Sequence, residues 1–298
     1  MDMKKKKTSL LRELLAKPGA IVMPMCYDGV SARLIERAGF DVVGVTGSGV
    51  SASMLGASDV GLLTMTEIVW QARNIAKAVS APVVCDADTG YGNPINVMRC
   101  IREFEAAGVA GIYFEDQVHP KKCGHFKGKM VIDSEEMVNK IEAACDARED
   151  KDFLIIARTD SRAILGVNEA IRRGKAYARA GADVIYIEAP ESIDEMKSFC
   201  DSIDAPQMFN VVEGGKSPLL SVTELEQIGY KLVSFSNSLL RTGIKAMQDV
   251  LSELKQKGST ADFADRMISF EKRNEILGLA NIYQLEERYM VKEKTNSQ

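Results

Sequence analysis

The sequence predicts an α/β protein folded as a (β/α)8 TIM barrel with extra helices at its C-terminal end. Two observations indicate this fold. Eight short, almost continuously apolar runs rich in Val and Ile recur along the 298-residue chain, as fully buried parallel strands do. Segments with helical periodicity lie between them, and this alternation favours a closed barrel over an open, doubly wound sheet.

Each expected strand alternates with an expected helix. The strands are Ala20–Met25, Asp41–Thr46, Pro82–Asp86, Gly111–Glu115, Phe153–Arg158, Asp183–Glu188, Pro206–Asn210 and Leu232–Ser236. The helices are Gly29–Ala38, Glu67–Val79, Pro94–Ala107, Ser134–Ala147, Val167–Ala180, Ile193–Ser202 and Val222–Ile228. Pro94 is a typical first-turn proline. Gly39, Gly108, Gly181 and Gly229 stand where helices should end.

The domain organisation follows from length. A barrel of this type uses about 250 residues, so we expect one domain, 1–298, with the barrel in residues 10–257 and a helical extension in residues 261–290. The segment Ala261–Tyr289 has an apolar stripe that includes Phe263, Phe270 and Ile276. That stripe needs a packing partner, so a subunit interface is expected there.

Composition excludes several classes of protein. The chain is 46% hydrophobic and 27% charged, with a net charge of −4, which argues against binding to nucleic acid. The basic run Lys4–Lys7 is expected to be a solvated tail. No window is long and apolar enough to span a bilayer, and no apolar stretch before Pro18 suits a secretory signal. The six cysteines lack paired spacing, so reduced thiols and a cytoplasmic location are expected.

Polar or ionisable residues follow six consecutive expected strands. Barrel enzymes place their chemistry at the C-terminal ends of the strands, and charged groups are otherwise rare at the ends of buried strands. The residues concerned are Thr46, Gly47, Ser48, Gly49, Asp86, Asp88, Glu115, Asp116, Arg158, Thr159, Asp160, Glu188 and Asn210. The sequence therefore predicts an active site at this rim.

Six of these rim residues are acidic: Asp160 and the five that are expected to form one cluster, namely Asp86, Asp88, Glu115, Asp116 and Glu188. Packed together without a cation they would repel one another, and some would be forced to protonate. Carboxylates without a His or Cys pattern suit Mg2+ or Mn2+. Asp86 and Asp88 are two residues apart, so a regular strand would point both the same way. The alternative is a set of helix-capping aspartates, which applies best to Asp116.

The loop after the fourth strand, His119–Lys129, is rich in lysine and glycine and contains Cys123. Neighbouring cations favour the thiolate, so this cysteine is expected to be reactive, and a cationic, glycine-flanked lid suits a dianionic substrate. A basic surface loop with an incidental cysteine is the alternative. Thr46-Gly47-Ser48-Gly49 suits either an anion-binding nest or a plain turn. Arg158 suits either a substrate carboxylate or a structural ion pair with Glu188 or Glu115.

From about Leu10 to Tyr289 the chain resembles the isocitrate lyase/phosphoenolpyruvate mutase superfamily. The motifs are Thr46-Gly47-Ser48 with Gly56 and Asp59, Asp86-Ala87-Asp88-Thr89-Gly90-Tyr91-Gly92, Ile112–Gln117, Lys121-Lys122-Cys123-Gly124-His125 and Ala157-Arg158-Thr159-Asp160. The fourth motif resembles the hallmark of the lyases, which implies a catalytic Cys123 with Lys121 and His125 beside it. The resemblance also implies a homo-oligomer, a dimer of dimers (homotetramer), with C-terminal helices exchanged between subunits.

The resemblance further assigns a place to each rim residue. It implies Mg2+, with Mn2+ as a substitute, held by Asp86 and Asp88, and by Glu115 through water. It implies an α-keto acid carboxylate at Thr46, Gly47 and Ser48, with Asp59 nearby. The other half of a dicarboxylate substrate would lie against Arg158, Glu188 and Asn210, and Arg158 and Glu188 would also act in catalysis.

The implied reaction is a retro-aldol/Claisen-type carbon–carbon cleavage of the oxo-acid-lyase type, with Cys123 as general acid. At Val212, relatives that cleave 2-methylisocitrate typically have a threonine able to bind a third carboxylate. The apolar Val212 favours a 2-alkylmalate such as 2,3-dimethylmalate, cleaved to pyruvate and propionate. The alternatives are 2-methylisocitrate, cleaved to pyruvate and succinate, and the phosphonomutase or oxaloacetate-cleaving reactions of the superfamily. A non-enzymatic binding protein is the alternative from a different class.

Overall fold

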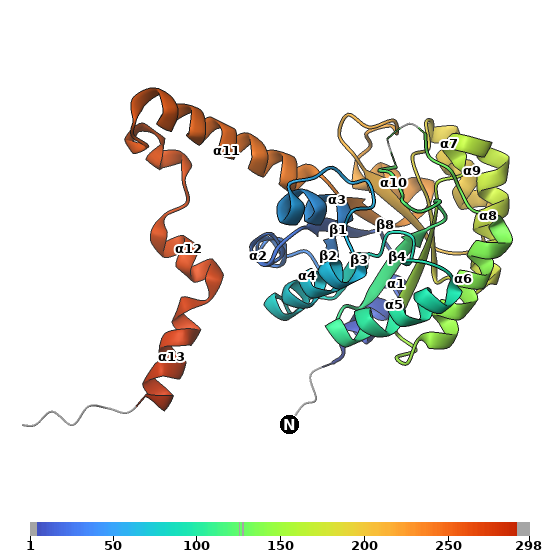
Figure 1. Cartoon of the computed structure of the whole chain (residues 1–298), viewed down its shortest axis with the longest axis horizontal. Helices are drawn as coiled ribbons and strands as arrows, with labels where there is room; N and C mark the ends of the chain where they lie inside the picture. Colours follow the sequence, from blue (N-terminus) through green and yellow to red (C-terminus); the bar gives the residue numbers. More distant parts are fainter. Residues whose placement is uncertain (1–4, 125, 127, 291–298) are drawn as a thin grey trace, which may run out of the picture. The chain divides into compact units, whose positions relative to one another are not determined.

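The structure, a computed structural model, describes residues 5–124, 126 and 128–290. Eight parallel strands pair in chain order, β1 with β2 through to β8 with β1, and close a barrel (Figure 1). The strands are β1 Ile21–Cys26, β2 Val43–Val45, β3 Val83–Asp86, β4 Gly111–Glu115, β5 Leu154–Thr159, β6 Val184–Ile187, β7 Gln207–Val211 and β8 Tyr230–Phe235. The predicted (β/α)8 fold is confirmed.

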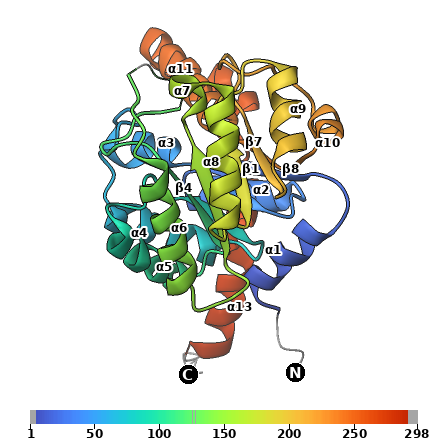
Figure 2. The same ribbon diagram turned by 90° about the vertical axis from the view of Figure 1, so that its right-hand side faces the viewer.

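Helices follow the strands and cover the outside of the barrel (Figure 2). They are α2 Gly29–Arg37, α3 Gly47–Val50, the π-helix η1 Ser51–Leu55, α4 Met65–Ala78, α5 Pro94–Ala107, α6 Ser134–Ala147, α7 Arg162–Leu165, α8 Val167–Arg179, α9 Ile193–Ser202 and α10 Val222–Ile228. Short capping motifs define many starts; for example, Asn93 accepts from the backbone N–H groups of Ile95 and Asn96 before Pro94 opens α5.

Two apolar layers stabilise the barrel. One lies between strands and helices, and the other fills the interior with every second strand residue, such as Met23, Leu154, Tyr186 and Leu232. Because strand side chains alternate, the inward-pointing set fixes which residues at the strand ends face the mouth of the barrel.

Helix α1, Lys7–Ala16, was not anticipated from the sequence. Its Leu11 is fully buried and packs with the interior residues of the strands, so α1 closes the N-terminal end of the barrel (Figure 2). The Lys7 ammonium donates to the Ala76 and Val79 carbonyls at 2.5 and 2.8 Å, where α4 ends. The expectation of a solvated tail is therefore wrong for Lys7, because its ammonium caps the last carbonyls of a neighbouring helix.

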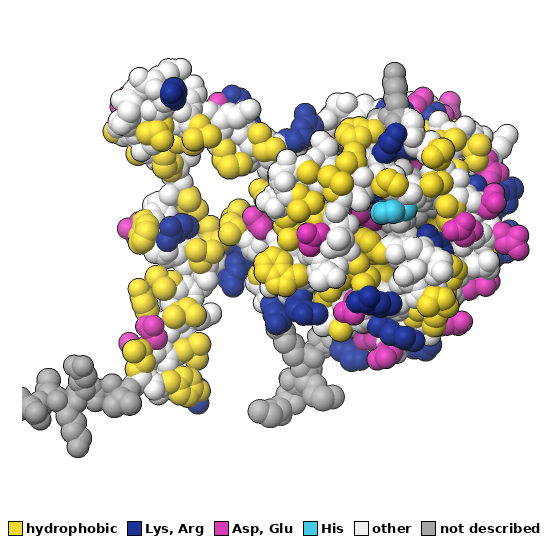
Figure 3. Space-filling view, viewed as in Figure 1, with side chains coloured by type: hydrophobic (Ala, Val, Ile, Leu, Met, Phe, Trp, Pro, Cys, Tyr) yellow, Lys and Arg dark blue, Asp and Glu magenta, His cyan; other side chains and the backbone are white. Residues whose placement is uncertain are grey.

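Contacts within the chain separate the residues up to Thr242 from those beginning at Gly243. The division falls inside α11, Ser238–Lys257, whereas the sequence suggested a barrel extending to residue 257. The second unit continues with the 3-10 helix η2 Ala261–Arg266, α12 Phe270–Leu277 and α13 Leu279–Tyr289. Apolar side chains lie exposed along these helices (Figure 3), among them Leu251, Phe270 and Tyr283. Among the described residues, no helix has the length and apolar character needed to cross a membrane.

Candidate active site

A small cavity of about 40 Å³ lies at the C-terminal mouth of the barrel. It is lined by Thr46, Ser48, Asp59, Asp86, Tyr113, Cys123, Gly124, Arg158, Tyr186, Glu188, Met208, Asn210, Val212, Ser234, Ser236 and Asn237. Most of the site residues expected from the sequence are thus brought to one place. A wider cleft of about 490 Å³ continues from it past Ser48, Cys123 and Val212 to Gly214, Gly215 and Arg241.

Asp86 ends β3, and its carboxylate is held by two backbone groups. The N–H of Gly47 donates to Oδ2 at 3.2 Å, and the N–H of Asp88 donates to Oδ1 at 3.0 Å. A Cβ on Gly47 would lie 2.8 Å from Asp86 Oδ2, so only glycine fits there without a shift. The nest expected at residues 46–49 thus gives one of its N–H groups to a carboxylate of the protein itself.

Asp88 reaches the site in a different way from the one expected. The strand ends at Asp86, and Asp88 has φ +46°, a left-handed conformation that is rare outside glycine. Its carboxylate accepts from the buried ammonium of Lys121 at 2.9 Å, and Asp59 accepts from the same ammonium at 2.6 Å. Burial raises the pKa of Asp88 to about 6, against the lowering effect of Lys121.

Glu115 is almost completely buried at the end of β4. Its Oε1 accepts from Gln117 at 2.8 Å, whereas Oε2 has no hydrogen-bond partner and faces Arg158 Nε at 3.2 Å. Burial raises the pKa of Glu115 well above its usual range, although Arg158 acts in the opposite direction. A buried carboxylate oxygen without a hydrogen bond marks a place where a further ligand or water would bind.

These carboxylates suit a hard divalent cation that keeps much of its water shell. Within the described residues, no three His, Cys, Asp or Glu side chains are gathered closely enough to hold a metal by protein ligands alone. Asp86 and Asp88 adjoin one another through a hydrogen bond, and Glu115 offers Oε2, which accepts no hydrogen bond. The donor set therefore fits Mg2+ with several waters better than a fully protein-coordinated metal.

Arg158 is the cation at the centre of the rim. Its Nε donates to Asp160 Oδ2 at 2.8 Å, and its Nη2 lies 3.8 Å from Glu188 Oε2. The guanidinium also stacks over Tyr186, whose hydroxyl donates to Glu188. Burial opposes charge on Arg158, but the surrounding carboxylates, Asp160 first, raise its pKa well above the usual value.

The loop after β4 folds over this cluster. A short antiparallel pairing of Gln117 with Val131 forms its base. The N–H of Cys123 donates to the Asp59 carbonyl at 3.1 Å, and Gly124 follows directly against Arg158. A Cβ on Gly124 would lie 2.6 Å from Arg158 Nη2 and would overlap Glu188, so any other residue would displace these two side chains. His125, expected beside Cys123, lies outside the described residues.

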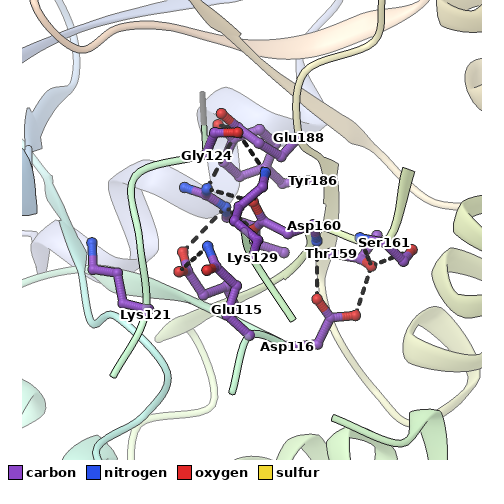
Figure 4. Close-up of polar contacts among 12 residues, drawn as sticks. Glu115, Asp116, Lys121, Gly124, Lys129, Thr159, Asp160, Ser161, Tyr186 and Glu188 are labelled. Carbon is purple, nitrogen blue, oxygen red and sulfur yellow. Dashed lines mark hydrogen bonds and ion pairs between the residues drawn. The ribbon is translucent and has the colours of Figure 1, made fainter. Parts of the chain in front are cut away.

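Asp116 does not join the acidic rim. It points outward from the barrel and accepts from Thr159, Arg173 and Tyr177 at 2.6, 2.9 and 2.8 Å. Strand alternation explains this placement, because Glu115 faces inward and the next residue must face the helices. The expectation that Asp116 belongs to the metal cluster is wrong, and its role is structural. It does not cap a helix either, although its carboxylate holds several groups together (Figure 4).

Several residues that line the cavity were not predicted from the sequence. Each of them lies two positions before another inward-facing residue, which is in the same strand or directly after it. They are Tyr113, Tyr186, Met208 and Ser234. Ser234 donates to Asn210 Oδ1 at 2.9 Å, which leaves the Asn210 amide N–H groups to face other partners. The alternation of side chains along each strand could have predicted them, because a residue two positions before an inward-facing one also faces inward.

Comparison with known proteins places this site in context. The family described as phosphoenolpyruvate phosphomutase matches residues 11–255. The 2,3-dimethylmalate lyase of Eubacterium barkeri is 48% identical over 94% of this chain and 96% of its own. The 2-methylisocitrate lyase of Aeropyrum pernix is 41% identical over 94% and 89%.

A crystal structure of phosphonopyruvate hydrolase with oxalate and Mg2+ superposes with a TM-score of 0.88 at 31% identity, covering 96% of this chain and 100% of the other. The relatives named as lyases confirm the prediction of a carbon–carbon lyase. The matched family, the sequence identities and the near-complete coverage agree, and the chain belongs to the phosphoenolpyruvate mutase/isocitrate lyase superfamily.

Proposed function

We propose that the protein is a Mg2+-dependent lyase that cleaves a 2-alkylmalate, with 2,3-dimethylmalate giving pyruvate and propionate. The main supporting observation is Cys123 at the edge of a cavity that also contains Arg158, Glu188 and Asp86. A thiol beside a cation and a carboxylate suits protonation of a carbanion formed by bond cleavage. The relative that is 48% identical is named 2,3-dimethylmalate lyase, which supports this substrate.

Asp86 and Asp88 would hold the cation, with Glu115 helping through a water molecule. The bound cation would withdraw electron density from a hydroxyl and a carboxylate on the same carbon, making the hydroxyl more acidic. Mn2+ would substitute because it accepts the same oxygen ligands. The related phosphonopyruvate hydrolase crystallised as a complex with oxalate and Mg2+, which supports this assignment.

The remaining steps belong to the residues of the chain. Thr46, Gly47 and Ser48 bind the carboxylate of the pyruvate half, with Asp59 beside them. When the hydroxyl loses its proton, the bond between C2 and C3 breaks and its electron pair moves into the carboxylate attached to C3. Arg158 stabilises that developing charge from the buried rim.

The Cys123 thiol then donates its proton to C3, which completes the propionate. Glu188 and Asn210 orient this half of the substrate, and Lys121 supports the loop that carries the thiol. Closure of the loop that carries Cys123 would keep bulk water away from the carbanion, which water could otherwise protonate in place of the thiol.

The second candidate substrate is 2-methylisocitrate, which would give pyruvate and succinate. The outer cleft favours it, because about 490 Å³ of space lies beyond Val212 and includes Arg241, a cation able to meet a third carboxylate. The relative from Aeropyrum pernix is named for this reaction. Val212 itself favours the smaller substrate, because a hydrophobic side chain leaves a buried carboxylate without a donor.

Release of the 2-oxo acid in the presence of Mg2+ tests the proposal: pyruvate is measured with citramalate, 2,3-dimethylmalate and 2-methylisocitrate, and glyoxylate with malate and isocitrate. The highest kcat/KM is expected for 2,3-dimethylmalate. A preference for 2-methylisocitrate supports the second candidate. Formation of a phosphonate from phosphoenolpyruvate, or cleavage of oxaloacetate without any pyruvate release from the malates, contradicts the lyase assignment.

We also propose a homo-oligomer, a dimer of dimers. Exposed apolar side chains on α11 to α13, such as Leu251, Phe270, Ile282 and Tyr283, suit burial against another subunit. Analytical ultracentrifugation of the whole chain is expected to give the mass of four chains, and a monomer across the micromolar range contradicts this arrangement. The cytoplasmic location stays a prediction.

A further inference from the structure

Asp160, just after β5, shares its carboxylate between two cations from different segments. Its Oδ2 accepts from Arg158 Nε at 2.8 Å, and its Oδ1 accepts from Arg158 Nη2 at 3.2 Å and from Lys129 Nζ at 2.7 Å. The side chains of Arg158, Asp160 and Lys129 are 9%, 0% and 2% exposed. Figure 4 shows Lys129 beside Asp160 at the rim.

Lys129 connects this anion to the chain segment of the cysteine. The same ammonium donates to the carbonyl of Gly124, the residue that follows Cys123 (Figure 4). Lys129 is therefore bonded at once to the barrel wall and to the peptide next to the thiol. Because Gly124 also lies against Arg158 and Glu188, a shift of this peptide would move Cys123 relative to the guanidinium.

Asp160 is itself immobilised. Its backbone N–H donates to Asp116 Oδ1 at 2.9 Å, and Asp116 accepts from Arg173 and Tyr177 in the layer outside the strands. Burial opposes its ionisation, but Arg158 and Lys129 lower the pKa of Asp160 to about 2, so it remains an anion at neutral pH. An anion held in one position can in turn hold the groups that bond to it, and so fix the placement of Arg158 and of the segment of Cys123.

We infer that Lys129 and Asp160 are positioning residues that hold the backbone beside Cys123 in a fixed position relative to the guanidinium of Arg158. Asp160 orients Arg158 by direct hydrogen bonds, and Lys129 links the same carboxylate to the carbonyl of Gly124. Neither side chain lines the cavity, so both act through the residues that do. This inference rests on the proposed roles of Cys123 and Arg158.

The variant that tests it is Lys129→Met in the full-length enzyme, with Lys7→Met as the matched control. Lys7 also donates from its ammonium to backbone carbonyls, at 2.5 and 2.8 Å, but lies at the opposite end of the barrel. A displacement of about 1 Å between reacting groups costs about 100-fold in rate, so kcat should fall by about that factor in Lys129→Met while KM changes little. Lys129→Arg, which keeps a charged donor, should recover most of the loss, and Lys7→Met should keep the wild-type kcat.

A second readout does not depend on the substrate assignment. Alkylation of Cys123 by iodoacetamide is followed by mass spectrometry of its peptide, at the alkaline plateau where the thiol is fully ionised in both proteins. It should be about 10-fold faster in Lys129→Met because the released segment exposes the thiol. Asp160→Asn should accelerate alkylation as well. The double variant should show no more than the larger single effect, because both changes break one interaction.

Unchanged kcat together with unchanged alkylation in Lys129→Met overturns the inference. So does a lowered melting temperature with unchanged kcat and alkylation, which would identify a structural ion pair. If no candidate substrate is cleaved by the wild type, the proposed function fails, and the alkylation rates alone decide whether Lys129 positions the cysteine.

Discussion

Both ends of the barrel contain carboxylates that are buried or half-buried, but the two ends differ in whether both oxygens of the carboxylate accept hydrogen bonds. At the N-terminal end, the carboxylate of Asp183 accepts from Arg12 at 2.8 Å, from Arg148 at 2.7 Å and from the N–H of Ile155 at 2.8 Å. At the C-terminal end, Glu115 is more deeply buried, yet its Oε2 has no hydrogen-bond partner. The Asp183 carboxylate is saturated because both of its oxygens accept hydrogen bonds, although Arg148 Nε beside it has no partner, whereas the Glu115 carboxylate has one oxygen that accepts none.

This difference separates structural charges from functional ones. A saturated carboxylate such as that of Asp183 stabilises the native state because both of its oxygens accept hydrogen bonds. An unsaturated cluster costs stability unless a ligand completes it, so it persists where binding requires it. Asp88 adds to the contrast, because it is both left-handed in backbone conformation and raised in pKa by burial. Asp116 lies next to Glu115 but resembles Asp183, because both of its carboxylate oxygens accept hydrogen bonds.

The largest expected effect is the loss of the proton donor. Cys123→Ser should lower kcat by about 1,000-fold, because general acid catalysis contributes on that order, while binding of an unreactive dicarboxylate measured by calorimetry persists. Cys145→Ser, which changes a half-buried cysteine on α6, is the control and should keep full activity. Undiminished turnover of Cys123→Ser removes this residue from the mechanism.

The metal ligands should show the next largest effect. Chelation should abolish turnover, and added Mg2+ or Mn2+ should restore it. Asp86→Asn should raise the Mg2+ concentration at half-maximal activity at least ~100-fold, since even residues behind metal ligands change affinity 10- to 100-fold. Asp183→Asn, at the saturated end, should leave the Mg2+ dependence unchanged. Full activity in the presence of excess chelator contradicts the metal assignment.

The saturated cluster is expected to affect stability instead of activity. Asp183→Asn should lower the free energy of unfolding by about 2–3 kcal/mol, because it removes a partly buried anion from two arginines. Denaturant titration measures the loss, and kcat/KM of the folded enzyme should stay at the wild-type value. A large fall in kcat/KM with unchanged stability would reverse the assignment of the two ends.

The smallest expected effect concerns specificity at the mouth. Val212→Thr should shift the ratio of kcat/KM values by about 10-fold from 2,3-dimethylmalate toward 2-methylisocitrate, the range expected when one contact changes in a pocket. Parallel pyruvate-release assays on the two substrates measure it. Val212→Ala, which enlarges the site without adding a hydroxyl, is the control. An equal shift in both variants would indicate that space, and not a hydroxyl donor, sets the preference.

Much of the fold and of the rim was readable from the sequence, because it depends on local patterns. Buried parallel strands are short apolar runs, and the residue that ends such a run must lie at the C-terminal mouth. Asp86, Glu115, Arg158, Glu188 and Asn210 were located in this way, and all of them lie at the mouth of the barrel. Helix ends were similarly marked by glycine and by capping residues.

Only the tertiary structure decided which of these residues meet. Closure of the barrel set the inward and outward faces, which placed Tyr186 in the cavity and turned Asp116 away from it. It also brought Lys121 to Asp59, and Lys129 to Asp160, across long stretches of chain. The sequence determined the strand ends because neighbouring residues specify them, whereas ion pairs between distant residues depend on the folded arrangement of all eight strands.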